Sequence, residues 1–351
     1  MRIRFTIISI LIFAYAIAIA QIPAHYYDSA IGLDGLPKKQ ALHNIIDNHT
    51  SVSYGSLHTH YQTTDKKPNG KVWDMYSDVP GGTPPYEFTF MSDKCGSYQH
   101  EGDCYNREHS FPQSWFKKKS PMKSDLFHVY PTDGKVNGMR SSYPYGEVSN
   151  PTKTSQNGCK LGPNTTAGYS GKVFEPIDAY KGDFARTYFY MATRYYGEDG
   201  SWQNNAMVNG AEPKAWALAL LYQWHIQDPV SPKEINRNNA VYNVQHNRNP
   251  YIDHPEWVDS VWFPSASIKT STELMMSFFP NPANTEINLS IGKNKADFTI
   301  EIIDISGRVL FYSERKSNET KIDISALEAG MYIINVRNNR NQHKTLKLIK
   351  Q

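Results

Sequence analysis

Cysteine is scarce in this 351-residue sequence, which contains only Cys95, Cys104 and Cys159. An odd number of cysteines leaves at least one thiol unpaired within a monomer. Three scattered thiols also fall short of the four spaced ligands of a structural zinc site, so we expect no zinc site. Cys95 and Cys104 flank a short glycine-containing loop, and we predict a disulfide between them.

Charge of one sign is scarce as well, because 37 basic residues nearly balance 34 acidic ones and give a formal net charge of +3. This value does not by itself indicate a nucleic-acid-binding protein, since such binding depends on a local basic patch. A hydrophobic content of 39% with 13% aromatic residues is ample for a packed core and argues against disorder. The length exceeds that of one average domain, so we expect two folded units plus processing segments.

Long apolar runs are missing from the sequence after its first 20 residues. Residues 5–20 are apolar, follow Arg2 and Arg4, and end in Ala-Ile-Ala, which is the pattern of a signal peptide with a small-residue cleavage site. A membrane anchor is the alternative, but the run is short for a bilayer and Gln-Ile-Pro follows directly. We predict that residues 1–20 are a signal peptide and that the exported mature chain begins at Gln21 without a membrane span.

Residues 21–264 are expected to mix helices with a few strands. Apolar residues on one helical face predict a helix over residues 37–47, and a polar loop follows over residues 63–71. Aromatic and polar residues alternate over residues 86–90, which predicts a half-buried strand. Ala, Leu and Trp residues predict a mostly buried helix over residues 215–226, which the following Asp-Pro pair would end.

A further helical pattern covers residues 185–196 and is rich in tyrosine. Tyrosines in such a pattern are expected to be core residues rather than a platform for base stacking. The tyrosines concerned are Tyr188, Tyr190, Tyr195 and Tyr196.

The composition changes near Met275. Residues 265–276 are rich in Ser and Thr without periodicity and predict a linker. Short segments of alternating polarity, separated by turn pairs, then predict a small all-β sandwich over residues 277–351. The predicted strands cover residues 286–291, 298–304, 309–313, 321–325, 331–337 and 345–350. Nothing in this domain has the pattern of a catalytic or binding site.

Polar groups gather in two segments, residues 104–112 and 124–141. The first holds the adjacent pair Glu108 and His109, and a lysine-rich loop follows it. The second is typical of a strand that leads into a helix carrying Asn137, with a Thr-Asp pair that can cap the helix. A strand, a loop, a second strand and a helix can direct Glu108, His109 and Asn137 to one point.

These residue types suit the hydrolysis of a phosphodiester, which needs a base, a cation and donors for the phosphate. Glu108 and Asn137 supply hard oxygen atoms suited to a partly hydrated Mg²⁺. His109 points to the opposite side of the strand from Glu108 and can accept a proton near neutral pH. A Glu-His pair is nevertheless common, and a histidine is often only a hydrogen-bonded core residue, so these residues suggest the chemistry without establishing it.

The surrounding motifs resemble those of the endonuclease I family of extracellular and periplasmic bacterial nucleases. They are Asn-Arg-Glu-His at 106–109, Pro-Thr-Asp-Gly-Lys-Val-Asn at 131–137, Tyr-Pro-Tyr-Gly-Glu-Val at 143–148, Phe-Glu-Pro at 174–176, Lys-Gly-Asp-Phe-Ala-Arg at 181–186 and Gln-His-Asn-Arg-Asn-Pro-Tyr-Ile-Asp at 245–253. The resemblance covers residues from about 41 to 262, and several motifs in family order are a specific signal. Within the last motif, Arg248 with Asn247 and Asn249 either shapes a loop near the site or caps a turn.

The resemblance implies an α+β, helix-rich nuclease domain over residues 21–264, because the family belongs to the His-Me finger, or ββα-metal, nucleases. It implies that His109 is the general base and that Glu108 and Asn137 bind one Mg²⁺, with Mn²⁺ or Ca²⁺ as alternatives. The implied substrates are DNA and RNA, cut with little sequence preference by a monomer.

The family arginine that steadies the phosphate lies in a variable loop and has no certain counterpart here. Arg107, Lys123 and Arg140 are the candidates for this role. Phe127 departs from the family pattern, because relatives often carry a polar histidine at this place. The departure puts a secondary polar contact in doubt, but not the base.

The tail resembles the C-terminal sorting domain of type IX secretion substrates. The resemblance rests on Phe-Pro-Asn-Pro-Ala at 279–283, Gly-Arg at 307–308, Gly-Met-Tyr at 330–332 and Leu-Lys-Leu-Ile-Lys at 346–350. It implies passage through the periplasm and the type IX secretion machinery to the medium or the cell surface. A carbohydrate-binding sandwich is the alternative for the tail, and a non-catalytic surface protein that binds nucleic acid or glycan is the alternative for the whole chain.

Overall fold

The computed structural model describes residues 22–264, 276–291, 297–304, 308–315, 319–338 and 343–351. The chain divides into two compact units, Met1–Pro264 and Ser265–Gln351, and each is described by itself. The predicted signal peptide lies outside the described residues, and so does the predicted linker except for Met276, which already begins a strand. No helix in the described ranges is long and apolar enough to cross a membrane.

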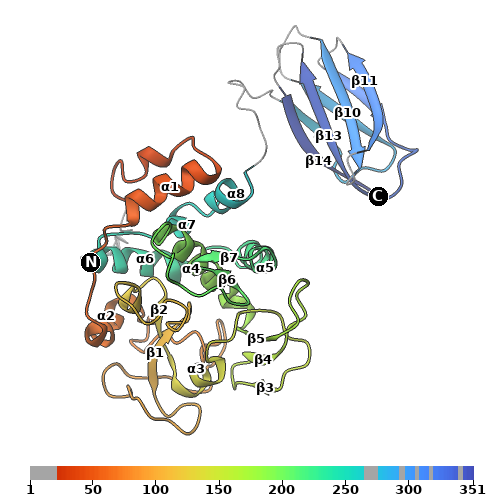
Figure 1. Ribbon diagram of the computed structural model, residues 1–351. Coiled ribbons are helices and arrows are strands. Elements are labelled where there is room, and N and C mark those ends of the chain that lie inside the picture. The colour runs from red at the N-terminus through yellow and green to blue at the C-terminus, as the bar shows by residue number, and fades with distance from the viewer. Residues whose placement is uncertain (1–21, 265–275, 292–296, 305–307, 316–318, 339–342) are drawn as a thin grey trace, which may run out of the picture. The chain divides into compact units, whose positions relative to one another are not determined.

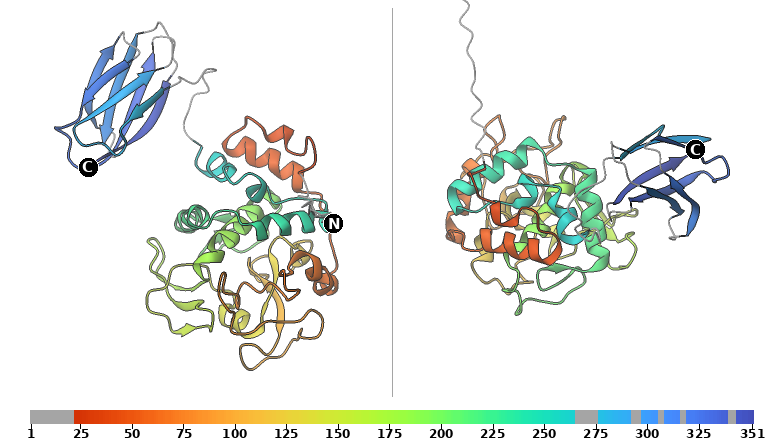
Figure 2. Two further views of the ribbon diagram at one scale, coloured as in Figure 1. Left: turned by 180° about the vertical axis from the view of Figure 1, so that it is seen from behind. Right: turned by 90° about the horizontal axis from the view of Figure 1, so that it is seen from above.

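The first unit combines helices with three small antiparallel sheets (Figure 1). Its helices are α1 (Gly35–Ile46), α2 (Leu57–Thr64), α3 (Gly134–Arg140), α4 (Lys181–Arg194), α5 (Ala215–Gln227), α6 (Pro232–Gln245), α7 (Pro250–Asp253) and α8 (Trp257–Trp262). The sheets pair β1 (Tyr105–His109) with β2 (Val129–Asp133), join β3 (Lys153–Thr154), β4 (Lys160–Pro163) and β5 (Lys172–Glu175), and pair β6 (Val208–Asn209) with β7 (Glu212–Pro213). Helices α1 and α8 lie at one end of the unit, and β1, β2 and α3 lie at the other (Figures 1 and 2).

Helix α4 is the centre of the first unit's core, because every one of its 14 residues is buried. Tyr188, Tyr190 and Tyr195 are fully buried in and beside it, which confirms them as core residues. The predicted helices near 37–47 and 215–226 are confirmed as α1 and α5. The expectation that α5 is mostly buried is wrong, because only one side of it packs into the core and Ile226 is 55% exposed.

The predicted strand over residues 86–90 is also wrong. This segment forms no ladder with another strand, although the Phe88 carbonyl accepts one hydrogen bond from Val72 N at 3.0 Å. Side-chain contacts hold the segment instead, since Glu87 pairs with Lys67 and Phe88 is buried in the core. The alternation of aromatic and polar residues therefore reflects a half-buried irregular segment.

Strands β1 and β2 pair antiparallel, and helix α3 begins at the residue after β2. The three elements form one strand–strand–helix unit. The register places Glu108 opposite Tyr130 and His109 opposite Val129. Helix α3 follows β2 directly because the Asp133 side chain accepts a hydrogen bond from Val136 N at 2.8 Å and caps the helix. This local arrangement carries the polar residues of both segments singled out above.

The second unit contains two sheets with one shared apolar core. A four-stranded sheet has the order β11 (Val309–Arg315), β10 (Phe298–Asp304), β13 (Gly330–Asn338) and β14 (His343–Lys350). A three-stranded sheet has the order β12 (Glu319–Asp323), β9 (Glu286–Ile291) and β8 (Met276–Phe279). Alternate residues such as Ile287, Ile300 and Ile334 are buried between the sheets, as period-two burial requires. The sequence predicted six of these strands within a few residues and missed β8, which is short.

Candidate active site

Two elements bring the predicted site residues to one cavity of about 430 Å³ in the first unit. Strand β1 carries Glu108 and His109, and helix α3 carries Asn137. All three residues line the cavity, whose wall also includes Tyr54, Asn106, Arg107, Pro112, Gln113, Gly138, Arg140, Ser141 and Ser142. The sequence segments 104–112 and 124–141 therefore meet in space.

Glu108 is 2% exposed and is held from two sides. The Tyr76 hydroxyl donates a hydrogen bond to Glu108 Oε1 at 2.9 Å, and Arg140 Nη1 lies 3.2 Å from the same oxygen atom. Burial raises the pKa of the Glu108 carboxyl, and the positive charge of Arg140 opposes that rise. Tyr76 and Arg140 contact the same oxygen atom, and together they orient the carboxylate within the cavity.

Arg140 lies inside the protein, at 1% exposure. In addition to Glu108, its guanidinium donates to the His109 carbonyl oxygen at 2.8 Å and to the Ser110 carbonyl oxygen at 2.5 Å. One buried cation therefore ties the end of helix α3 to the end of strand β1. These contacts favour a positioning role for Arg140 over a direct contact with phosphate.

His109 is 5% exposed and has a defined hydrogen-bonding partner. Its Nε2 atom lies 3.0 Å from the Lys123 carbonyl oxygen. A carbonyl oxygen only accepts hydrogen bonds, so Nε2 carries the ring proton and Nδ1 keeps its lone pair. Burial lowers the pKa of the imidazole to about 3, with the nearby His128 contributing. The free ring is therefore neutral at pH 7, and its pKa lies well below the near-neutral value expected from the sequence.

Asn137 is half-buried on the cavity side of helix α3. Its Nδ2 atom donates to the Asn106 side-chain oxygen at 2.6 Å, which uses the amide nitrogen and not the amide oxygen. Within the described ranges, no group of three or more His, Cys, Asp or Glu side chains could hold a metal ion. Glu108 and Asn137 therefore present side-chain oxygen atoms to the same cavity from two different elements.

Two of the candidate phosphate ligands meet at the ring of Tyr54. The Arg107 guanidinium carbon lies 3.8 Å from the centre of this ring, and Lys123 Nζ lies 4.7 Å from it. Arg107 also donates to the Tyr54 carbonyl oxygen at 2.9 Å, and the ring stacks near His109. Arg107 lines the cavity and Lys123 does not, and both residues are partly exposed, unlike Arg140.

Two residues that shape the site, Tyr76 and Tyr54, gave no recognisable signal in the sequence, whereas Gln245 opens the motif at 245–253. Tyr76 orients Glu108 from 32 positions away. Arg107 and Lys123 both lie against the ring of Tyr54, which begins the 3-10 helix Tyr54–Ser56 that leads directly into α2. Gln245 accepts a hydrogen bond from Leu126 N at 2.6 Å and donates to Asp125 Oδ1 at 3.0 Å. These two bonds brace the chain just after Lys123, whose carbonyl contacts His109.

The neighbouring motif residues have structural partners. Arg248 pairs with Asp253, and Asn249 caps helix α7 by accepting from Tyr251 N. Asn247 donates to the Tyr190 hydroxyl at 2.8 Å. Phe127, where the family pattern departs, is buried with its ring centre 4.6 Å from that of Tyr190. This group therefore shapes turns and the core, and it does not line the cavity.

A disulfide joins Cys95 and Cys104, with Cα atoms 5.7 Å apart. It closes the loop that precedes strand β1, and Cys95 lines the cavity. Cys159 is a buried free thiol, and burial raises its pKa to about 12. A thiol with so high a pKa stays protonated, so Cys159 is a core residue here.

Comparison with known proteins identifies both units. Residues 277–351 match the family described as secretion system C-terminal sorting domain, and the protein is therefore secreted or displayed at the cell surface. An extracellular ribonuclease of Bacillus amyloliquefaciens is 37% identical over 246 residues, which cover 68% of this chain and 78% of the relative. An extracellular ribonuclease of Bacillus subtilis is 34% identical with the same coverage.

A third relative is the endonuclease-1 of Buchnera aphidicola subsp. Acyrthosiphon pisum, which is 29% identical over 156 residues. That match covers 44% of this chain and 54% of the relative. The first unit gives the decisive match, because residues 35–256 fit the family described as Endonuclease I. Together with the 37% identity to the first relative, this match shows that the chain belongs to the endonuclease I family.

Proposed function

We propose that the protein is a secreted, divalent-metal-dependent endonuclease that cuts RNA and DNA with little sequence preference. The observation that carries the proposal is the convergence of Glu108, His109 and Asn137 on one cavity in a chain of this family. The relatives named extracellular ribonuclease support RNA as a substrate. A relative named periplasmic deoxyribonuclease, from Aeromonas hydrophila, supports DNA; it is 27% identical over 133 residues, which cover 38% of this chain and 48% of the relative. The arrangement of β1, β2 and α3 is the one expected of a His-Me finger, and we assign the site to that class.

The donor set of the cavity fits Mg²⁺, with Mn²⁺ or Ca²⁺ as alternatives. Glu108 and Asn137 would hold the ion through oxygen atoms, and two protein ligands suit a cation that keeps several waters. When bound, the cation supplies neutralisation of the charge that develops on the phosphate and the leaving oxygen. Arg140 opposes the rise in the pKa of the Glu108 carboxyl and fixes the orientation of that group.

The protein's own groups supply the remaining parts of the reaction. His109 takes a proton from the attacking water at Nδ1, because its Nε2–H is committed to the Lys123 carbonyl. Arg107 and Lys123 are positioned beside the cavity to hold phosphate oxygens. Contacts of this kind read no base edges, so binding is electrostatic and tolerant of sequence.

The test is cleavage of supercoiled plasmid and of single-stranded RNA by the purified protein, with Mg²⁺ and with excess chelator. Both polymers should be cut into scattered fragments, chelator should stop the reaction, and added salt should weaken it steeply. Cleavage that persists in chelator would overturn the metal assignment, and discrete fragments from one site would overturn the lack of specificity. Binding without cleavage in the presence of Mg²⁺, Mn²⁺ and Ca²⁺ would establish the non-catalytic alternative.

A further inference from the structure

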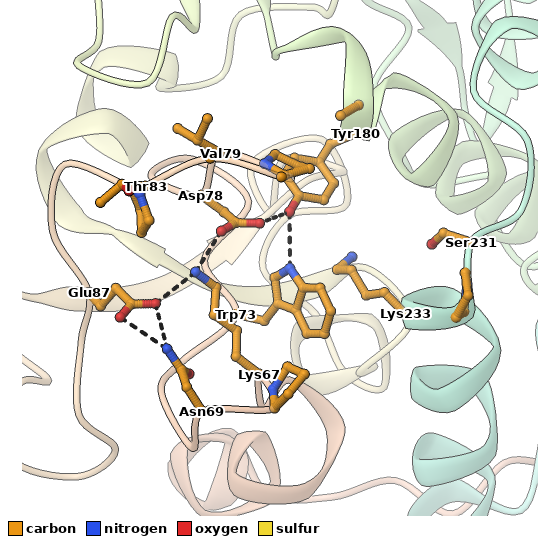
Figure 3. Close-up of a pocket in the computed structure, with 17 residues that line it drawn as sticks. Lys67, Asn69, Trp73, Asp78, Val79, Thr83, Glu87, Tyr180, Ser231 and Lys233 are labelled. Carbon is orange, nitrogen blue, oxygen red and sulfur yellow. Dashed lines mark hydrogen bonds and ion pairs between the residues drawn. The ribbon is translucent and has the colours of Figure 1, made fainter. Parts of the chain in front are cut away.

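A second and larger cavity, of about 670 Å³, lies in the first unit and shares no lining residue with the active site. It is bounded by the loop segments around residues 67–69 and 78–87, by Tyr180 before helix α4, and by the start of helix α6 (Figure 3). Its volume lies in the usual range for small-molecule sites, which is roughly 300–1,000 Å³. The cavity is therefore large enough for one nucleoside.

The walls of the second cavity are flat and mostly apolar. Trp73 lies at the centre of the lining, with its indole nitrogen toward Tyr180 (Figure 3). Trp73 Nε1 donates to the Tyr180 hydroxyl at 3.0 Å, and that hydroxyl in turn donates to Asp78, so both rings are fixed. The remaining walls include Pro68, Pro80, Pro84 and Pro232. Rigid aromatic and proline surfaces of this kind suit a planar ring.

Each lysine that lines this cavity is already paired with a carboxylate, although the partner of Lys233 lies outside the lining. Lys67 Nζ lies 2.5 Å from Asp78 Oδ1 and 3.0 Å from Glu87 Oε1. Lys233 Nζ lies 2.5 Å from Asp183 Oδ1, and it sits over the Tyr180 ring at 5.1 Å and over the Trp73 ring at 5.9 Å. Because each lysine has a carboxylate partner, the cavity offers a poor site for phosphate. It favours a neutral ring with polar edges, which is the chemistry of a nucleobase.

One short stretch of chain connects this cavity to the active site. Trp73 and Asp78 line the cavity, whereas Tyr76 between them donates to Glu108. Three residues of chain span at most about 11 Å, so the Cα atoms of Trp73 and Tyr76 lie no farther apart than this. Trp73 is therefore close to the residue that orients the Glu108 carboxylate. The second cavity therefore lies within the length of a few nucleotides of the active site.

We infer that the second cavity binds one unpaired base of the nucleic-acid substrate, stacked on Trp73, at a position that flanks the cleaved bond. The inference rests on the proposed function, since the substrate must be a nucleic acid. Stacking on an aromatic ring accepts any base, because every base has a π-face. The cavity therefore adds affinity for single-stranded segments without adding sequence preference.

The test compares Trp73→Ala with the full-length protein in a binding assay that needs no turnover. Fluorescence anisotropy of a labelled single-stranded octanucleotide is measured in excess chelator, beside a blunt duplex of the same sequence. Trp73→Ala should weaken binding of the single strand about five-fold or more, the usual effect of losing one stacked base, and leave the duplex unchanged. Trp73→Phe keeps a flat ring and should retain most of the affinity.

Two controls separate this inference from the proposed function. Trp216→Ala removes a half-buried tryptophan that stacks on Tyr169 and lines neither cavity, and it should leave single-strand binding unchanged. Trp73→Ala should also hydrolyse the baseless diester bis(p-nitrophenyl) phosphate at the wild-type rate. Unchanged octanucleotide binding by Trp73→Ala, or an equal loss on the baseless diester, would overturn the base subsite. A wild-type protein that binds through Trp73 but cleaves nothing would overturn only the proposed function.

Discussion

The Nε2 atom of His109 lies 3.0 Å from the backbone carbonyl oxygen of Lys123. This single contact fixes the tautomer, because the carbonyl requires a donor and thereby leaves Nδ1 as the acceptor. Burial keeps the ring neutral at pH 7 by lowering its pKa to about 3. A neutral, oriented imidazole at the edge of the cavity is the form that a general base must have before it acts.

The first prediction concerns His109→Ala. We expect this variant to bind Mg²⁺ and nucleic acid normally and to lose turnover by roughly two to four powers of ten, the usual contribution of a positioned base. Added imidazole should restore part of the activity, because the missing group is a base and the cavity admits it. Single-turnover cleavage and calorimetric Mg²⁺ titration provide the measurements. Loss of Mg²⁺ binding in His109→Ala would show that the histidine is a ligand and not the base.

The second prediction concerns Glu108→Gln, which should fail at a different step. The amide is a weaker ligand than the carboxylate, so Mg²⁺ binding should weaken and excess Mg²⁺ should restore some cleavage. The change also leaves the buried Arg140 without its charge partner, which typically costs about 3–5 kcal/mol of stability. Calorimetry of Mg²⁺ binding and a chemical denaturation curve test both effects. Wild-type metal affinity in a folded Glu108→Gln protein would remove Glu108 from the ligand set.

A third prediction distinguishes Arg140 from Arg107. Arg107→Ala should weaken nucleic-acid binding and lower the slope of log affinity against log salt by about one, because one phosphate contact is lost. Arg140→Lys should lower stability and turnover but leave that slope unchanged, since its guanidinium contacts Glu108 and two carbonyl oxygens. Binding is measured over a salt series in chelator. A reduced slope for Arg140→Lys would restore this residue as a phosphate ligand.

The parts of the site that could be predicted from the sequence are those encoded locally. The Asp133 cap before α3 and the motifs at 106–109 and 131–137 are short-range signals, and they indicated that Glu108, His109 and Asn137 would lie together. The tail was predictable for the same reason, because period-two burial repeats along strands such as β9 and β10. These features depend on neighbours within one element.

The remaining features depend on contacts between distant segments. Tyr76 reaches Glu108 across 32 positions and Gln245 reaches Leu126 across 119, and no periodic pattern marks either residue. Arg140 was a phosphate candidate by composition, and only its burial against Glu108 indicates a different role. The strand predicted over residues 86–90 was wrong because alternation of aromatic and polar residues indicates only that one side of the segment is buried. An irregular segment can be buried on one side as well.

The fourth prediction concerns the hydrogen bonds of Gln245, which hold the chain next to Lys123 and its contact with His109. Gln245 is fully buried, and Gln245→Ala would leave the Leu126 N–H without its partner, which costs about 1–3 kcal/mol. Because this bond follows Lys123 closely in the chain, we expect a lower kcat with little change in KM. Gln227→Ala, an exposed substitution at the end of helix α5, is the matched control and should change neither. A Gln245→Ala protein that loses stability but keeps wild-type kcat would show that the brace has no effect on His109.

The fifth prediction is that the sorting domain contributes nothing to catalysis. The two units have separate cores, and every residue that lines the catalytic cavity belongs to the first unit. A chain that ends near Ser271 should therefore keep kcat and KM for plasmid within about two-fold, because none of the contacts that orient Glu108 or His109 is removed. The same truncation in the producing cell should abolish export, since the matched sorting domain is lost. Activity is compared on purified proteins, and export is measured by immunoblotting of medium and cell fractions.

As a control, deletion of residues 347–351 removes part of β14 and should impair export while sparing cleavage. A truncated protein that is folded by circular dichroism yet inactive would show that the tail completes the catalytic unit, and export of the truncated chain at the wild-type level would show that the tail is not the sorting signal.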